Sequence, residues 1–214
     1  MKLNTLARSS GLAAMALTLS FGLAACGGEE EPTTGSEETT SEAPAEEEPA
    51  EEAADAGADT FGPGCSAIPA EGAGSFNGMA TEPVASAASA NPLLETLVGA
   101  VDQAKLVEPL NSAPELTVFA PTNDAFAAVP KDTMSSVMSD NKVLSQVLTH
   151  HVVGQRISPD QLSGEFETLN GDMLTINGSG ESATVGDDEK AEILCGNIQT
   201  ANATVYVIDT VQTP

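Results

Sequence analysis

The residues of this chain with the widest chemical potential are two adjacent histidines, His150 and His151. A histidine can serve as a general base, a metal ligand or a pH sensor. Adjacent side chains do not converge on one metal from a helix or a strand, and no third ligand stands at a recognised spacing. Leu144, Leu148 and His151 follow i, i+4, i+7 spacing, which places His151 on the apolar face of a helix. We therefore expect a buried His151 whose ring bonds backbone or polar groups, with a ligand-binding or pH-sensing role as the alternative.

Nucleophilic catalysis is the second chemistry that the residue types allow. An active serine or cysteine needs a base and a group that orients the base. The serines are numerous, but none lies in a nucleophile-elbow context, and no glycine-rich loop follows a strand in a phosphate-cradling form. The run Asp187-Asp188-Glu189 lacks the alternating ligands of a calcium loop and predicts a solvated turn. These patterns predict a protein that is not an enzyme and that uses neither a metal nor a cofactor.

Cys26 stands at the end of an N-terminal leader. A short basic segment comes first, followed by an apolar stretch too short to span a bilayer as a helix. Leu23-Ala24-Ala25-Cys26 resembles the bacterial lipobox. The resemblance implies a signal peptide at residues 1–25 that is cleaved before Cys26, and acyl chains such as palmitate on Cys26. Two or three such chains anchor a protein stably in a membrane. We expect it on the extracytoplasmic face of the cell membrane, with partial shedding or secretion as a second fate. An ordinary secretory signal with a chance cysteine is the alternative.

Residues 26–60 combine the lipid-bearing cysteine with an acidic, low-complexity segment. From Gly27 to Thr60 the chain has thirteen acidic residues and no lysine or arginine. Its apolar content is too low to offset the entropy of ordering, so we expect a disordered tether. The whole chain has a formal charge of −25, and residues 61–214 hold nineteen acidic and five basic residues, a charge of −14. Phosphates would be repelled, which excludes nucleic acid as a partner.

Cys65 and Cys195 are the two cysteines that remain beside Cys26. An even pair in an exported protein predicts one disulfide, which here would close most of a domain. Two lone cysteines this far apart lack the spacing of a zinc site. We therefore expect one domain at residues 61–214 that begins with a disulfide-bearing extension.

The sharpest local pattern in the domain is a strand that passes directly into a helix. Leu116–Ala120 is a short apolar run with β-branched and aromatic members, which predicts a buried strand. Pro121 should end it, because proline has no N–H for a ladder. Thr122 is placed as a helix N-cap, Asp124 lies in the first turn, and Phe126 belongs to the buried face. The role expected of this junction is architectural.

Helices and strands occupy different parts of the domain. Helical patterns fall at residues 79–90, 91–101, 104–110, 134–138 and 143–151. From Glu165 onward apolar residues recur at every second position, which predicts strands, and Asn170-Gly171 predicts a hairpin turn. One strand among helices, followed by a run of strands, predicts an α+β fold with an antiparallel or mixed sheet.

Three segments together resemble the signatures of the fasciclin domain family. They are Thr117–Phe126, with Thr122, Asn123, Asp124 and Phe126; Leu148–Val153, with His150 and His151; and Ala203–Val211, with Tyr206 and Asp209. Their order and separations also match, and the resemblance covers roughly residues 79–214. It implies that these eight residues have a structural role or an interaction role.

The resemblance also implies a fold and a function. The fold is an α+β fasciclin-type wedge, a β-sandwich of about seven strands with a packed helical layer. The flanks of Cys65 and Cys195 are similar to single-domain members of mycobacterial type, which are secreted or lipid-anchored surface antigens. We expect a monomer that mediates adhesion or another interaction with a surface protein or glycan, and binding of a small apolar ligand or lipid is the alternative. Family members often have tyrosine where this chain has His150, so the integrin binding linked to animal relatives is not expected here.

Overall fold

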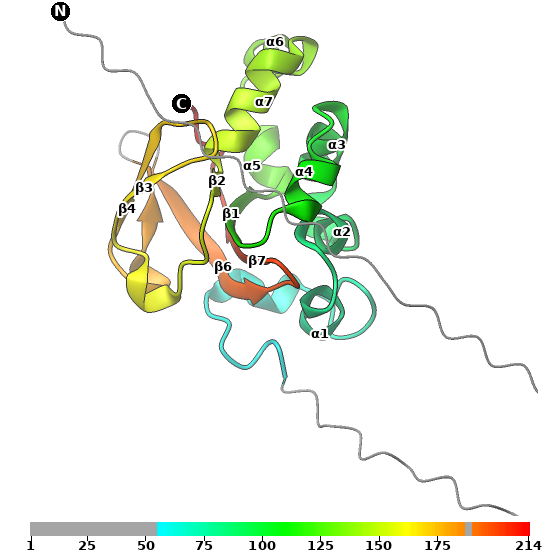
Figure 1. Cartoon of the computed structure of the whole chain (residues 1–214), viewed down its shortest axis with the longest axis vertical. Helices are drawn as coiled ribbons and strands as arrows, with labels where there is room; N and C mark the ends of the chain where they lie inside the picture. Colours follow the sequence, from blue (N-terminus) through cyan, green and yellow to red (C-terminus); the bar gives the residue numbers. More distant parts are fainter. Residues whose placement is uncertain (1–54, 187–189) are drawn as a thin grey trace, which may run out of the picture. The chain divides into compact units, whose positions relative to one another are not determined.

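The computed structural model describes residues 55–186 and 190–214, and Figure 1 shows the arrangement of their helices and strands. The expected signal peptide, the lipid site Cys26, the tether up to residue 54 and the turn at 187–189 lie outside the described residues. The Ala56 N–H donates to Asn77 Oδ1 (2.8 Å), and the Asn197 side-chain amide donates to Asp59 O (3.1 Å). The packed part of the chain therefore includes residues that precede Phe61.

Seven strands form one mixed sheet in the order β2-β1-β7-β6-β5-β4-β3. The strands are β1 (Leu116–Pro121), β2 (Val152–Val153), β3 (Gly164–Glu167), β4 (Met173–Asn177), β5 (Thr184–Val185), β6 (Ala191–Gln199) and β7 (Ala203–Ile208). Neighbouring strands are antiparallel except β1 and β7, which run parallel with Val118 opposite Val205. The mixed sheet expected from the order of elements is confirmed.

The two halves of this sheet enclose an inner core. Two register shifts interrupt β6, which pairs with β5 at its start and with β7 along its length, and such irregularities bend a strand. The inner core takes Phe119 and Tyr206 from one half and Leu174 and Ile176 from the other. An isolated bridge between Val153 and Thr168 joins β2 to the residue that follows β3. The sheet is thus folded over a shared core, as a sandwich requires.

Helices pack against the half of the sheet that contains β1 and β7 (Figure 1). They are α1 (Phe76–Ala80), α2 (Val84–Ser89), α3 (Glu95–Gln103), α4 (Val107–Ser112), α5 (Asn123–Ala128), α6 (Lys131–Ser139) and α7 (Asn141–His150). Four short 3-10 helices are η1 (Pro63–Ala67), η2 (Pro92–Leu94), η3 (Pro159–Gln161) and η4 (Gly180–Ser182). Leu97, Leu144 and Leu148 pack with Val118 and Val205 of the sheet in a second, helical core. The expected α+β fold of seven strands with a helical layer is confirmed.

One expected helix is interrupted. Residues 79–90 form parts of two helices, α1 and α2, because Pro83 stands between them and cannot donate a backbone hydrogen bond to the preceding turn. The longest described helix, α7, has ten residues. Among the described residues, no helix has the length and apolar character needed to cross a membrane.

The N-terminal extension is fastened to β6 by the predicted disulfide, which is confirmed. Cys65 and Cys195 are bonded with their Cα atoms 4.8 Å apart, and Cys195 is fully buried. Phe61 and Gly196 form an isolated antiparallel bridge beside it. A Cβ at Gly196 would lie 2.4 Å from the Phe61 ring, so only glycine lets the ring lie over the strand here.

Candidate functional site

The three motif segments meet at strands β2, β1 and β7, in one half of the sheet. β1 lies between β2 and β7, and Thr117 is paired with Val153 on one side and Thr204 on the other. Every residue of β1 and β7 is buried. The Phe119 N–H donates to His151 O (2.9 Å), which joins the first segment to the second. The motifs therefore mark the place where three distant parts of the chain come together.

His151 is enclosed in this junction at the C-terminal cap of α7. Its Nδ1 lies 2.7 Å from Val147 O, and its Nε2 accepts the Gln212 N–H at 2.9 Å. A carbonyl only accepts and an amide N–H only donates, so these partners select the neutral ring with its proton on Nδ1. Burial lowers the pKa of His151 to about 4. The ring is bonded to backbone, as expected, and neither nitrogen is left for a metal or a substrate.

His150 is also buried, but it bonds to the β3–β4 hairpin. Its Nδ1 lies 2.8 Å from Asp172 Oδ1, and Asp172 also accepts hydrogen bonds from the Asn170 amide and the Thr168 hydroxyl. Partial burial alone would raise the pKa of Asp172, but the bonds from Thr168, His150 and Asn170 outweigh it and lower the pKa. The Asn170-Gly171 turn signal was visible in the sequence, whereas the role of Asp172 was missed because its histidine partner is remote in the chain.

Tyr206 fills the inner core next to Phe119. The two rings are stacked with their centroids 5.6 Å apart, and the Tyr206 hydroxyl donates to Ile157 O at 2.7 Å. Tyr206 has no exposed surface, and burial raises its pKa above the usual range. Phe126, the other aromatic motif residue, is buried in the helical core. Both residues stabilise the fold, and Tyr206 is not available to a partner.

The passage from β1 to α5 differs in one detail from the expectation. Pro121 is the last residue of β1 and is still in register with Ile208, whereas the strand was expected to end at Ala120, and the Thr122 N–H also bonds Ile208 O at 3.1 Å. The Thr122 hydroxyl accepts the Ala125 N–H at 3.2 Å, which confirms the expected N-cap. The chain therefore leaves the sheet at Thr122, one residue later than predicted.

Asn123 links two helices at this passage. Its side-chain oxygen accepts the Thr96 N–H, and its amide donates to Pro92 O, both at 2.9 Å. These bonds tie the first turn of α5 to η2 and to the start of α3. Asn123 therefore acts as a shared cap, a role that no local pattern around it reveals.

Four of the motif residues line one surface hollow of about 450 Å³: Thr122, Asn123, Asp124 and Asp209. Asp209 uses its Oδ1 to accept the Glu192 N–H (2.8 Å) and the Thr210 hydroxyl (3.0 Å), whereas Asp124 is exposed. Within residues 55–186 and 190–214, no three His, Cys, Asp or Glu side chains gather as a metal site would require. Asp124 is thus the motif residue best placed to meet a partner.

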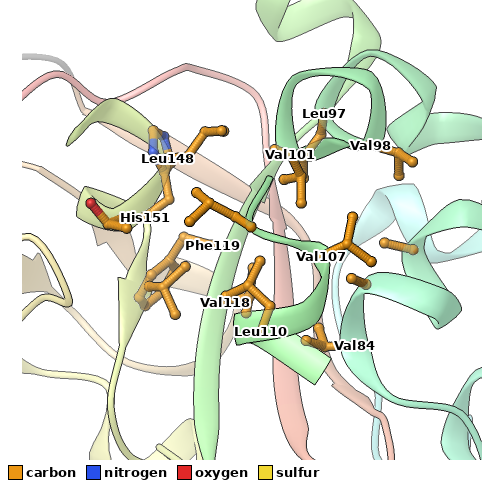
Figure 2. Close-up of a pocket in the computed structure, with 15 residues that line it drawn as sticks. Val84, Leu97, Val98, Val101, Val107, Leu110, Val118, Phe119, Leu148 and His151 are labelled. Atoms are coloured by element: carbon orange, nitrogen blue, oxygen red, sulfur yellow. The ribbon is translucent and has the colours of Figure 1, made fainter. Parts of the chain in front are cut away.

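An apolar cavity lies between the helices and β1. Figure 2 shows Leu148 and His151 at one side of it and Leu97, Val98 and Val101 at another. Its volume is about 50 Å³, which is space for a few waters but well below the 300–1,000 Å³ of ordinary ligand sites. Because the His151 nitrogens are engaged with backbone, its ring brings no free polar group to the wall.

A larger groove of about 360 Å³ runs between α5, α6, α7 and the C-terminal segment. Met134, Val137 and Met138 of α6 line it, together with Phe126 and Leu144. α6 has no fully buried residue, so this methionine-rich face is partly open. Methionine adapts its shape to different apolar contacts, which suits a variable ligand.

Comparison with known proteins places this geometry in a family. Residues 92–214, more than half of the chain, match the family model for the fasciclin domain. The cell surface glycolipoprotein MPB83 of Mycobacterium bovis is 39% identical over 97% of this chain and 95% of its own length. The immunogenic protein MPB70 of the same species is 43% identical over 74% of this chain and 84% of its own length.

A solved FAS1 domain pair from the insect cell adhesion molecule fasciclin I has 23% identity and a TM-score of 0.47, and the match covers 56% of this chain and 44% of that one. The residues matched by the family model include all three motif segments. The chain belongs to the fasciclin domain family.

Proposed function

We propose that this protein is anchored by lipid to the extracytoplasmic face of the cell membrane, where its domain binds surface proteins or glycans and mediates adhesion without catalysis. The observation that carries the proposal is the 39% identity to a cell surface glycolipoprotein over 97% of this chain. That similarity extends well beyond the fasciclin match at residues 92–214, into the N-terminal part that holds the lipobox-like segment.

The anchor is tested by metabolic labelling with an alkyne-tagged palmitate. The unaltered chain should take up the label and sediment with membranes, whereas Cys26→Ser should be unlabelled and enter the soluble fraction. Gly28→Ser, which spares the cysteine, is the matched control. Labelling of the Cys26→Ser variant at another residue would contradict the proposed anchor.

Binding without catalysis is supported by how the motif side chains are used. Both nitrogens of His151 bond to backbone, and Tyr206 is buried, so neither can act on a substrate. Asp124 remains exposed in the hollow that the motif residues share. We expect beads coated with the Cys26→Ser chain to bind cell-envelope extracts, and Asp124→Lys to weaken that binding. Retention that is equal on uncoated beads would overturn the adhesion proposal.

A second candidate function is binding of a small apolar ligand or lipid at the cell envelope. The groove beside α6 favours it, because its volume of about 360 Å³ lies within the range of ligand sites and its walls carry two methionines. Native mass spectrometry of the protein purified from its own membranes should then show a bound lipid that Met138→Glu releases. Ligand-free protein from that preparation would oppose this second function.

A further inference from the structure

The outer edge of β3 carries backbone groups that face away from the rest of the sheet. β3 is the last strand and pairs only with β4. The Thr168 N–H donates to Asp172 O (2.9 Å), and hydrogen-bonded pairs alternate along an antiparallel ladder. On the far side of β4, the bond from the Gly186 N–H to Thr175 O (2.8 Å) fits the same alternation. The backbone of every second residue from Thr168 therefore faces β4, and the residues between face outward.

The outward residues are Glu165, Glu167 and Leu169, and β2 covers only one end of this row. The Leu169 N–H donates to Val152 O at 2.7 Å, next to the isolated bridge that joins the two edges. Further along, an open cleft of about 570 Å³ is lined by residues 153–155 on one side and 165–169 on the other. Among the outward-facing residues, Glu165 lies furthest from the end of the row that β2 covers, so its N–H and C=O face the open part of this cleft.

The two faces of β3 differ in chemistry. Glu165 and Glu167 are exposed on one face, while Phe166 between them packs against the inner core. A strand added to the edge of a sheet continues both faces. Its side chains would therefore be basic on the face of the two glutamates and apolar on the face of Phe166. A second copy of this chain would bring glutamate against glutamate, which disfavours self-pairing.

We infer that the outer edge of β3 docks an extended peptide segment with alternating basic and apolar residues, which adds to the sheet as a further strand. Its backbone bonds the N–H and C=O of Glu165, and its lysines or arginines pair with Glu165 and Glu167. The inference deepens the proposed function and rests on it only for the premise that the domain has protein partners. Peptide binding can fail while lipid anchoring and glycan binding hold, so the two failures are distinguishable.

The test uses the full mature chain with Cys26→Ser and the end-blocked heptapeptide Lys-Val-Lys-Val-Lys-Val-Lys. We expect saturable binding, with amide NMR shifts at Glu165 and Glu167. The same peptide with N-methyl groups along one edge should bind on the order of tenfold more weakly, because it loses the N–H that donates to the C=O of Glu165. Glu165→Pro should have a similar effect, since it removes only the outward N–H and proline is tolerated at such edge positions. Glu165→Ala keeps that N–H and should lose less.

Charge reversal gives an independent arm. Glu165→Lys/Glu167→Lys should switch preference to the peptide Glu-Val-Glu-Val-Glu-Val-Glu, whereas Glu95→Lys/Glu108→Lys, the same charge change on exposed helical sites, should not. Equal binding of the N-methylated peptide to the unaltered protein would overturn the inference, even if Glu165→Pro fails to fold. Shifts confined to other strands, binding of neither peptide, or dimers formed through β3 would overturn it as well.

Discussion

The centre of the sheet, which we define as β1, β7 and β6, and its outer hairpin of β3 and β4 face different surroundings. All six residues of β1 and all six of β7 are buried, whereas β3 has no fully buried residue. β4 alternates, with Leu174 and Ile176 buried and Met173 exposed. Five of the eight motif residues are buried and Asp124 is exposed, so the strongest sequence signals mark mainly positions that a partner cannot reach.

The last turn of α7 connects these two regions. His151 bonds the C-terminal segment beside the centre, and His150 bonds Asp172 in the hairpin. Two adjacent residues of one type thus hold opposite regions in place. The difference shows that these two motif histidines stabilise the fold. Sites of contact with a partner are therefore expected at the exposed sheet edge and in the surface hollows around them.

The largest effect should come from removing the disulfide that fastens the extension to the centre. The Cys65→Ala/Cys195→Ala variant frees a loop with a sequence separation of 130, for which loop entropy predicts a loss of about 5 kcal/mol as an upper value. Urea unfolding with and without reductant measures it. A loss below about 1 kcal/mol, with the unaltered protein also insensitive to reductant, would show that the extension adds little to the centre.

The next effect contrasts one side chain of the centre with one of the hairpin. Tyr206→Ala should lower the free energy of unfolding by about 3–5 kcal/mol, because it removes a fully buried aromatic ring. Met173→Ala, at an exposed position in β4, should change it by less than about 0.5 kcal/mol. Tyr206→Phe isolates the hydroxyl and should cost about 1–3 kcal/mol, since Ile157 O loses its partner. Equal losses at both sites would contradict the comparison.

The third prediction concerns pH. The pKa of His151 is about 4 in the folded protein and about 6.5 in the unfolded chain, so the unfolded state binds the proton first as the pH falls. The free energy of unfolding should therefore decrease between pH 6.5 and 4, by on the order of 3 kcal/mol. Denaturant midpoints across that range measure the slope, and His151→Gln should flatten it. Asp172, whose pKa is lowered, contributes stability that is lost only below its unfolded value of 3.8, outside this window.

Much of the fold was predictable because its signals are local. Thr122 predicts an N-cap because it precedes a helical pattern. The period of the apolar residues changes to two near Glu165, which predicts the strands. The disulfide followed from cysteine number alone. The parallel pairing of β1 with β7 did not follow, because it joins Leu116 to Ala203 across most of the domain, and no local pattern encodes that register.

The candidate sites were predictable only in part, for the same reason. The burial of His151 followed from its place on an apolar helical face. The Asp172 carboxylate, the Asn123 cap on α3 and the cleft beside β3 depend on elements that are distant in the chain. Local patterns predict the secondary structure of a segment. They do not predict which surface stays exposed once the segments pack together.

The smallest effect tests that distinction within a single motif. Thr122→Ala should cost about 1 kcal/mol, because it removes the cap on the Ala125 N–H. Asp124→Ala removes only a charge near an exposed helix start and should cost about 0.3–1 kcal/mol, less at high salt. Thermal unfolding of both variants, measured beside binding to envelope extracts, separates support from contact. Lost binding by Thr122→Ala with unchanged unfolding would mean that the cap residue itself is part of an interface. Lost binding by Asp124→Ala alone would assign the contact to the hollow beside the centre.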